Sequence, residues 1–246
     1  MTRLSVNVNK IALLRNSRGR DYPSVTGFVT RLLGLGVKGI TVHPRPDERH
    51  ITRKDVVQIS EQLKRHPGVE FNIEGYPSAA FMALVLQVKP QQCTLVPDAP
   101  GQLTSDHGWK ATREAELLIR TVDQLHKAGV RSSLFMEPDL EQIEAVKATG
   151  ADRIELYTEA FAAAFGSPGE SAVFQKYRQA AVRATELGIG VNGGHDLNLQ
   201  NLSQFLQIPG ILEVSIGHAL VVECLEHGVE SVVGRYLAIT GEAPAD

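Results

Sequence analysis

Residues 110–137, KATREAELLIRTVDQLHKAGVRSSLFME, contain one complete unit of the pattern that decides the fold. In residues 110–128 apolar side chains recur every three or four positions, which predicts an amphipathic helix. Gly129 follows at a position where helices commonly end, and residues 131–137 are typical of a short buried strand. The stretch therefore predicts a helix that leads directly into a strand.

The same alternation of strand-like and helix-like segments continues along the whole chain. A second clear amphipathic helix is expected at 171–187, and further helix ends are expected at Gly34 or Gly36, Gly150 and Gly188. Strands are expected at residues 4–9, 39–43, 69–75, 92–97, 131–137, 153–158, 189–193 and 212–218.

Eight strands, each followed by a helix, are the number that closes a (β/α)8 TIM barrel. An open doubly wound sheet usually has fewer strands and a GxGxxG turn after the first. The first turn here reads NVNKIALLRNSRG (7–19) and lacks that motif. No linker or low-complexity tract divides the chain, so we expect a single α/β barrel domain spanning residues 1–246.

Composition narrows the class of protein. The 246 residues are 43% hydrophobic and 22% charged, with a formal net charge of −3. This balance argues against nucleic acid or an anionic membrane surface as a partner. The first residues, MTRLSVNVNK, lack the apolar stretch typical of a secretory signal, no apolar run approaches the length needed to span a bilayer, and Cys93 and Cys224 lack CxxC spacing. We expect a cytoplasmic protein with two reduced thiols.

Polar residues collect where the expected strands end, which is the catalytic face of a barrel of this type. Such residues follow or close six of the eight strands, and the loop after the fourth strand adds more. They are Asn7, Asn9, His43, Glu74, Thr104, Ser105, Glu155, Asn192, His195, Asp196, Gly217 and His218. The distribution predicts an active site on this rim.

Two groups of residues on the rim suit phosphate. The turns NGGH (192–195) and SIGHA (215–219) supply glycines where backbone N–H groups can approach an anion. Arg18, Arg45 and His50 offer cationic donors near the first two strands. Arg49 is interpreted as a solvated loop charge.

Proton transfer is the second predicted property of the rim. His43, His195 and His218 lie at strand ends, whereas the other histidines are expected to be surface or local structural residues. Glu74 ends an apolar run, so burial is expected to raise its pKa; its alternative role is to orient Arg45. Glu155 either stabilises a developing positive charge or pairs with an arginine.

Metal and lysine chemistry find little support in the sequence. No HxH pair, HExxH helix or compact ligand cluster occurs, so we expect no metal and no cofactor. Lys10 is the only lysine close to an expected strand end. Any amine in carbonyl chemistry is therefore expected to come from a substrate.

Long motifs in a fixed order carry a resemblance to the pyridoxine 5′-phosphate synthase family. They run from residue 4 to about residue 235 and read LSVNVNKIALLRNSRG, GITVHPRPDERHI, FNIEGYP, TLVPDAPGQLTSDHGW, RIELYT, VNGGHDLN and SIGHA. The resemblance implies condensation of 1-deoxy-D-xylulose 5-phosphate with 3-amino-2-oxopropyl phosphate, which yields pyridoxine 5′-phosphate, phosphate and water. It also implies a homo-octamer.

The resemblance also implies a role for each residue of the rim. His43 and Glu74 would be proton acceptors, His195 the proton donor, and Glu155 the group that stabilises a cationic intermediate. Deoxyxylulose phosphate would be held by Arg45, His50 and Thr104. The aminoketone phosphate would be held by Asn7, Arg18, Asp196, Gly217 and His218.

Two positions depart from the family pattern, and one loop is a candidate lid. Many members have Asp-His where this chain has Asn9-Lys10, and Gly where it has Asp196. An aspartate would repel phosphate, so we expect Asp196 to contact an amine or to donate its backbone N–H. Residues 98–109 are the loop expected to close over the site.

Two alternatives to this function remain open from the sequence. The first is another phosphate-binding barrel, such as an isomerase or aldolase-like lyase that acts on one sugar phosphate. The second is a ligand-binding barrel without catalysis, against which His43, Glu74 and His195 argue because a binder needs no separated proton-transfer groups.

Overall fold

Eight parallel strands close into a barrel in the computed structural model, which describes residues 1–98, 101–102 and 104–242. Each strand pairs with the next in sequence, and β8 pairs with β1 to close the ring. The strands are β1 (Arg3–Asn7), β2 (Gly39–Val42), β3 (Glu70–Gly75), β4 (Gln92–Leu95), β5 (Arg131–Met136), β6 (Arg153–Tyr157), β7 (Gly190–Gly194) and β8 (Ile211–Ile216). The predicted (β/α)8 TIM barrel is confirmed.

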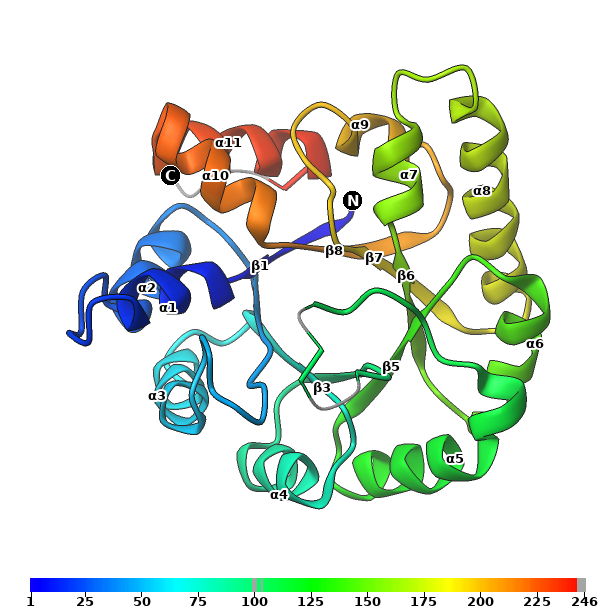
Figure 1. Cartoon of the computed structure of the whole chain (residues 1–246), viewed down its shortest axis with the longest axis horizontal. Coiled ribbons are helices and arrows are strands. Elements are labelled where there is room, and N and C mark those ends of the chain that lie inside the picture. Colours follow the sequence, from blue (N-terminus) through cyan, green and yellow to red (C-terminus); the bar gives the residue numbers. More distant parts are fainter. Residues whose placement is uncertain (99–100, 103, 243–246) are drawn as a thin grey trace.

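Helices surround the strands on all sides, as Figure 1 shows. They are α1 (Asn9–Asn16), α2 (Val25–Gly34), α3 (Arg53–Leu63), α4 (Ala79–Val88), α5 (Ala111–Lys127), α6 (Leu140–Thr149), α7 (Glu159–Ala164), α8 (Glu170–Glu186), α9 (Leu202–Phe205), α10 (His218–His227) and α11 (Val229–Thr240). The two clearest helix predictions agree with α5 and α8 to within one residue at each end. The apolar stripe of α5 is buried through Leu118, Val122 and Leu125.

Helix ends follow the glycine pattern. Gly129, Gly150 and Gly188 all have φ near +75°, a conformation that costs glycine little. Of the two candidates after α2, Gly36 has φ +94°, whereas Gly34 is the last helical residue. The stop is therefore Gly36.

The first strand is shorter than expected. It ends at Asn7 rather than residue 9, because the Asn7 side-chain oxygen accepts the backbone N–H of Asn9 at 3.0 Å and turns the chain into α1. Asn9 is thus the first residue of a helix. His218, expected to end the last strand, likewise begins α10.

The barrel interior below the rim is polar and hydrogen-bonded. Ser5 and Thr41 lie 2.7 Å apart through their hydroxyls, Asn72 donates to Thr41, and Thr94 donates to Asn72 at 3.0 Å. All four side chains are buried. This network ties the first four strands together beneath the site.

Two further predictions concern the chain as a whole. Cys93 and Cys224 are both free thiols, as expected. Over the described ranges, no helix has the length and apolar character needed to cross a membrane.

Candidate active site

A cavity of about 500 Å³ opens at the carboxyl ends of the strands. Every residue that the sequence singled out as catalytic or substrate-binding lines it, except Arg18. The polar lining comprises Asn7, Asn9, Lys10, His43, Arg45, Arg49, His50, Glu74, Thr104, Ser105, Glu155, His195, Asp196, Ser215 and His218. The barrel thus brings together residues from nearly all of its strand ends.

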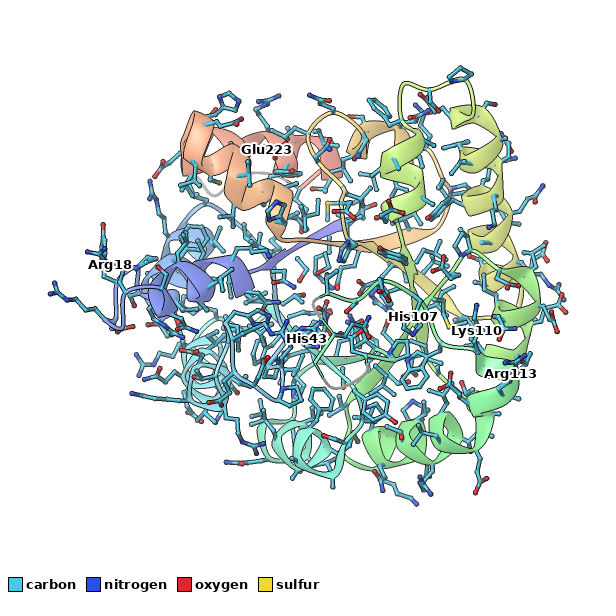
Figure 2. All side chains as sticks on the ribbon, in the orientation of Figure 1. Arg18, His43, His107, Lys110, Arg113 and Glu223 are labelled. Carbon is cyan, nitrogen blue, oxygen red and sulfur yellow. The ribbon has the colours of Figure 1, made fainter. Side chains whose placement is uncertain are left out.

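Arg18 lies apart from this cavity. It is exposed beyond the end of α1, and Figure 2 places it at the outer edge of the molecule, away from His43 near the centre. The eight residues of α1 carry the chain roughly 12 Å outward from the end of β1. The sequence pattern did not predict this position of Arg18, because residues 4–9 were expected to form a strand and the residues after them a loop beside the site.

His43 is positioned by the turn that ends the first strand. Its backbone N–H donates to the Asn9 side-chain oxygen at 2.9 Å. Its ring is buried, with Nδ1 4.0 Å from Oε2 of Glu74 and Nε2 3.9 Å from Oδ2 of Asp98. Burial, reinforced by the charges of Arg45, His50 and Arg49, holds the pKa of His43 well below its usual range. At neutral pH the ring is therefore uncharged and able to accept a proton.

Glu74 ends β3 and has the raised pKa that its apolar sequence surroundings predicted. Burial, reinforced by the carboxylates of Asp98 and Glu213, raises the pKa of Glu74 to about 8. Its Oε2 accepts a long hydrogen bond of 3.4 Å from the Asn7 side chain. A carboxyl group that titrates near neutrality can both accept and return a proton during a reaction.

Glu155 is more deeply buried and lies on β6 with its carboxyl group in the cavity lining. Its Oε2 has no hydrogen-bond partner within the described parts of the chain. Burial, together with the nearby Glu74 and Glu213, raises the pKa of Glu155 well above its usual range. Of the two roles left open by the sequence, pairing with an arginine is therefore wrong.

No sequence pattern marked Asp98 as a site residue, although its carboxylate organises the cationic side of the cavity. Its Oδ2 accepts from Arg45 Nη2 at 2.6 Å and from the Ser105 hydroxyl at 2.8 Å, and all three residues are buried. Arg45 also donates to the carbonyl oxygen of Gln102 at 2.8 Å. Arg45 is thus held by the loop that follows β4.

Removing the charge of Asp98 is expected to destabilise the fold. In Asp98→Asn the Arg45 guanidinium stays buried without a carboxylate partner, and we expect the free energy of unfolding to fall by roughly 2–4 kcal/mol. Urea unfolding measures the change. Ser105→Ala, which removes only a neutral donor to the same oxygen, is the control and should cost about 1 kcal/mol. A loss below about 0.5 kcal/mol in Asp98→Asn would show that the pair contributes no stability.

His50 is a neutral donor rather than the protonated one that the sequence suggested. Burial, with the charges of Arg45, Lys10 and Arg49, lowers the pKa of His50 to about 4. Its Nδ1 accepts the backbone N–H of Ile51 at 2.9 Å, so Nε2 carries the proton.

Arg49 differs from its interpretation as a solvated charge, because it lines the cavity and pairs with Asp47 at 2.6 Å.

His195 and Asp196 follow β7 and both line the cavity. His195 Nδ1 is 2.8 Å from Asp196 Oδ2, and its Nε2 is 3.2 Å from the Thr104 hydroxyl. His218 begins α10. The residue before it, Gly217, packs against Asn7, because a Cβ on Gly217 would lie 3.0 Å from the Asn7 Cβ. The remaining histidines lie outside the cavity, as expected; His107 and His126, for example, pair with Asp106 and Asp152.

The glycines of NGGH have a packing role. A Cβ on Gly193 would lie 2.5 Å from the Phe205 ring, and one on Gly194 would overlap the Glu155 carboxyl group. Neither glycine lines the cavity, whereas Gly217 of SIGHA does. The structure thus gives these two glycines a packing role, and the approach of phosphate to NGGH stays a prediction.

Two other expectations concern the loop after β4 and metal ions. In the expected lid, 98–109, positions 99, 100 and 103 lie outside the described residues, and the closing motion stays a prediction. No group of three or more His, Cys, Asp and Glu side chains able to hold a metal ion occurs in the part of the chain that the structure describes.

A buried base, carboxyl groups with raised pKa values and clustered cations, all at the carboxyl ends of barrel strands, define a (β/α)8 barrel with an acid–base site suited to anionic ligands. The model of one protein family, "Pyridoxal phosphate biosynthesis protein PdxJ", matches residues 4–242. The chain belongs to this family.

Relatives agree with this assignment, and solved structures agree with the fold. The chain is 50% identical to pyridoxine 5′-phosphate synthase of Bacteroides thetaiotaomicron, over 96% of this chain and 98% of the relative. It is 48% identical to the protein of that name from Leptospira biflexa, over 97% of each chain. Among solved structures, a mutant tryptophan synthase α-subunit of Pyrococcus furiosus superposes with a TM-score of 0.64 at 14% identity, over 98% of each chain. That likeness supports the fold alone.

Proposed function

We propose that the protein is a pyridoxine 5′-phosphate synthase, which condenses 1-deoxy-D-xylulose 5-phosphate with 3-amino-2-oxopropyl phosphate and releases phosphate and water. The observation that carries the proposal is the pairing of an uncharged His43 with a protonatable Glu74, 4.0 Å apart in a cavity that also contains Arg45. The names of the relatives at about 50% identity support it.

The proposed chemistry needs several proton transfers. Imine formation, loss of phosphate, enol formation, ring closure and dehydration each move a proton. His43, uncharged at neutral pH, suits the role of general base, and Glu74 suits a second acceptor that later returns its proton. His195, which also lines the cavity, is the proposed donor. Glu155, when ionised, would stabilise a cationic imine through its unpartnered oxygen.

Substrate binding divides between the two walls of the cavity. Arg45, His50 and Thr104 would hold deoxyxylulose phosphate, with His50 donating from Nε2 as a neutral ring. Lys10, which replaces a histidine of the family pattern, adds a cation beside His50. The aminoketone phosphate would lie near Asn7, Gly217 and His218, where the start of α10 presents backbone N–H groups. For Arg18, which lies outside the cavity, substrate contact stays a prediction.

The two-substrate requirement separates this function from its rivals. Phosphate release and product absorbance are measured with each substrate alone and with both together. We expect turnover only with both. Turnover of one sugar phosphate alone would favour an isomerase or lyase, and binding without turnover would favour a non-catalytic barrel.

Replacing His43 tests the proposed base. In His43→Ala we expect product formation to fall at least 10³-fold, because alanine has no side-chain group that is positioned to accept a proton. Circular dichroism should show an intact fold. His126→Ala, outside the cavity, is the control and should retain activity. Normal turnover by His43→Ala would remove the residue from the mechanism.

The setting of the enzyme is part of the same proposal. We infer a cytoplasmic protein that acts on small phosphorylated substrates without a cofactor and assembles into a homo-oligomer, an octamer by family resemblance. Light scattering coupled to gel filtration measures the oligomeric state.

A further inference from the structure

Adjacent side chains after β7 make an unusual direct contact. His195 Nδ1 lies 2.8 Å from Asp196 Oδ2, while Nε2 faces the cavity beside Thr104. An ionised carboxylate only accepts hydrogen bonds, so the contact requires a proton on Nδ1. Hydrogen bonding to His195 holds the pKa of Asp196 below its usual value, as does the nearby His218, against the effect of burial. Asp196 is therefore ionised over the neutral range.

The backbone is shaped to bring these two side chains together. His195 has φ +78° and Asp196 φ +49°, values that residues other than glycine seldom adopt. The Thr158 hydroxyl donates to the carbonyl oxygens of Gly194 and His195, and Asn201 donates to that of Asp196 at 3.3 Å. These bonds from two other segments hold a conformation that local preference disfavours.

The ring of His195 is also fixed from a third side. The Tyr157 ring packs against it edge to face, with centroids 5.1 Å apart and an interplanar angle of 82°. The imidazole is thus confined by Tyr157 and Asp196, and the only nitrogen left for a ligand is Nε2.

We propose that Asp196 is a positioning residue for His195 and not a contact for the aminoketone phosphate. It fixes the ring with the proton on Nδ1 and with Nε2 directed to the cavity. This inference rests on the proposed function of His195 as the proton donor. In the dehydration step, Nε2 of the neutral ring takes the proton that the substrate carbon loses, and the Nε2–H bond so formed then breaks as the proton passes to the departing hydroxyl oxygen. The C–O electron pair leaves with the water, and the Nδ1–H bond to Asp196 stays intact.

Asp196→Gly is the sharpest test, because glycine adopts φ +49° without a steric penalty and removes only the carboxylate. Asp196→Asn is the matched control for size, since asparagine also tolerates this conformation. Nitrogen NMR of the ring in the unliganded protein reports which nitrogen carries the proton. We expect Nδ1–H in the wild type and a shift toward Nε2–H in Asp196→Gly, with Asp196→Asn intermediate.

Kinetics provide the second readout. We expect kcat of Asp196→Gly to fall roughly 10–100-fold, while KM for each substrate changes less than about threefold. A raised KM for the aminoketone phosphate with unchanged kcat would overturn the proposal and make Asp196 a substrate contact. An unchanged tautomer in Asp196→Gly would overturn it as well. The NMR result needs no turnover, so it stands even if the proposed reaction itself fails to occur.

Discussion

Glu74→Gln is expected to abolish product formation and, at the same time, to make the folded protein more stable above neutral pH. Glutamine keeps the shape of the side chain but neither accepts nor returns a proton. Because Glu74 lies beside the base His43, we expect turnover to fall at least 10³-fold. Measured turnover within tenfold of the wild type would exclude Glu74 from proton transfer.

The gain in stability follows from the raised pKa of Glu74. Between its ordinary value of 4.5 and the folded value of about 8, the unfolded chain has released the proton while the folded protein retains it. The unfolded state then binds fewer protons, so the free energy of unfolding falls as the pH rises through this window. Glutamine removes this contribution, and the stability advantage of the variant should grow from pH 4.5 to pH 8, reaching about 4–5 kcal/mol.

Urea unfolding at several pH values measures the advantage of Glu74→Gln. The control for turnover is Glu137→Gln, which replaces a half-buried glutamate whose side chain lies outside the cavity lining. That variant should retain turnover. An advantage of Glu74→Gln that is constant with pH would contradict the raised pKa as its cause.

Local pattern made much of this site predictable. A strand end is visible in the sequence, and the barrel brings all strand ends to one rim, so His43, Glu74 and His195 could be placed together without knowing any contact. The same logic failed for Arg18, because the turn at Asn7 starts α1 early and carries the chain away from the rim.

Contacts between distant segments were not predictable. Asp98 lies three residues past β4, and its partner Arg45 is 53 residues away, so no local pattern marks the pair. The proton state of His50 depends on burial and on the neighbouring cations, which only the folded chain brings together. The alternating pattern around Glu155 fitted either a group that stabilises a positive charge or a partner of an arginine, and only the packing around its side chain decides between these roles.

Gly194→Ala is expected to damage the fold through a direct overlap inside the barrel. The new Cβ would overlap Oε1 of Glu155 and approach its Cδ at 2.9 Å, in a fully buried part of the barrel. Glu155 would have to leave its position or the backbone of β7 would have to shift. We expect a loss of about 3 kcal/mol in the free energy of unfolding and a fall in Tm of roughly 6–12 °C.

A double variant separates the overlap from any general intolerance of β7. In Gly194→Ala with Glu155→Ala the obstructing carboxyl group is gone, so the free energy of unfolding should recover most of the loss while turnover stays low. Gly190→Ala is the matched control on the same strand, because its Cβ approaches side-chain atoms, Cδ1 of Leu212 at 2.9 Å and Cγ of Arg153 at 3.0 Å, while the backbone oxygen of Asp152 stays 3.5 Å away. Thermal unfolding of the wild type, of the single variants Gly194→Ala and Glu155→Ala, and of the double variant yields the coupling energy between positions 194 and 155. A coupling energy near zero would mean that Gly194 is required for a reason other than Glu155, whereas a large favourable coupling ties the second glycine of NGGH to the buried carboxyl group of the site.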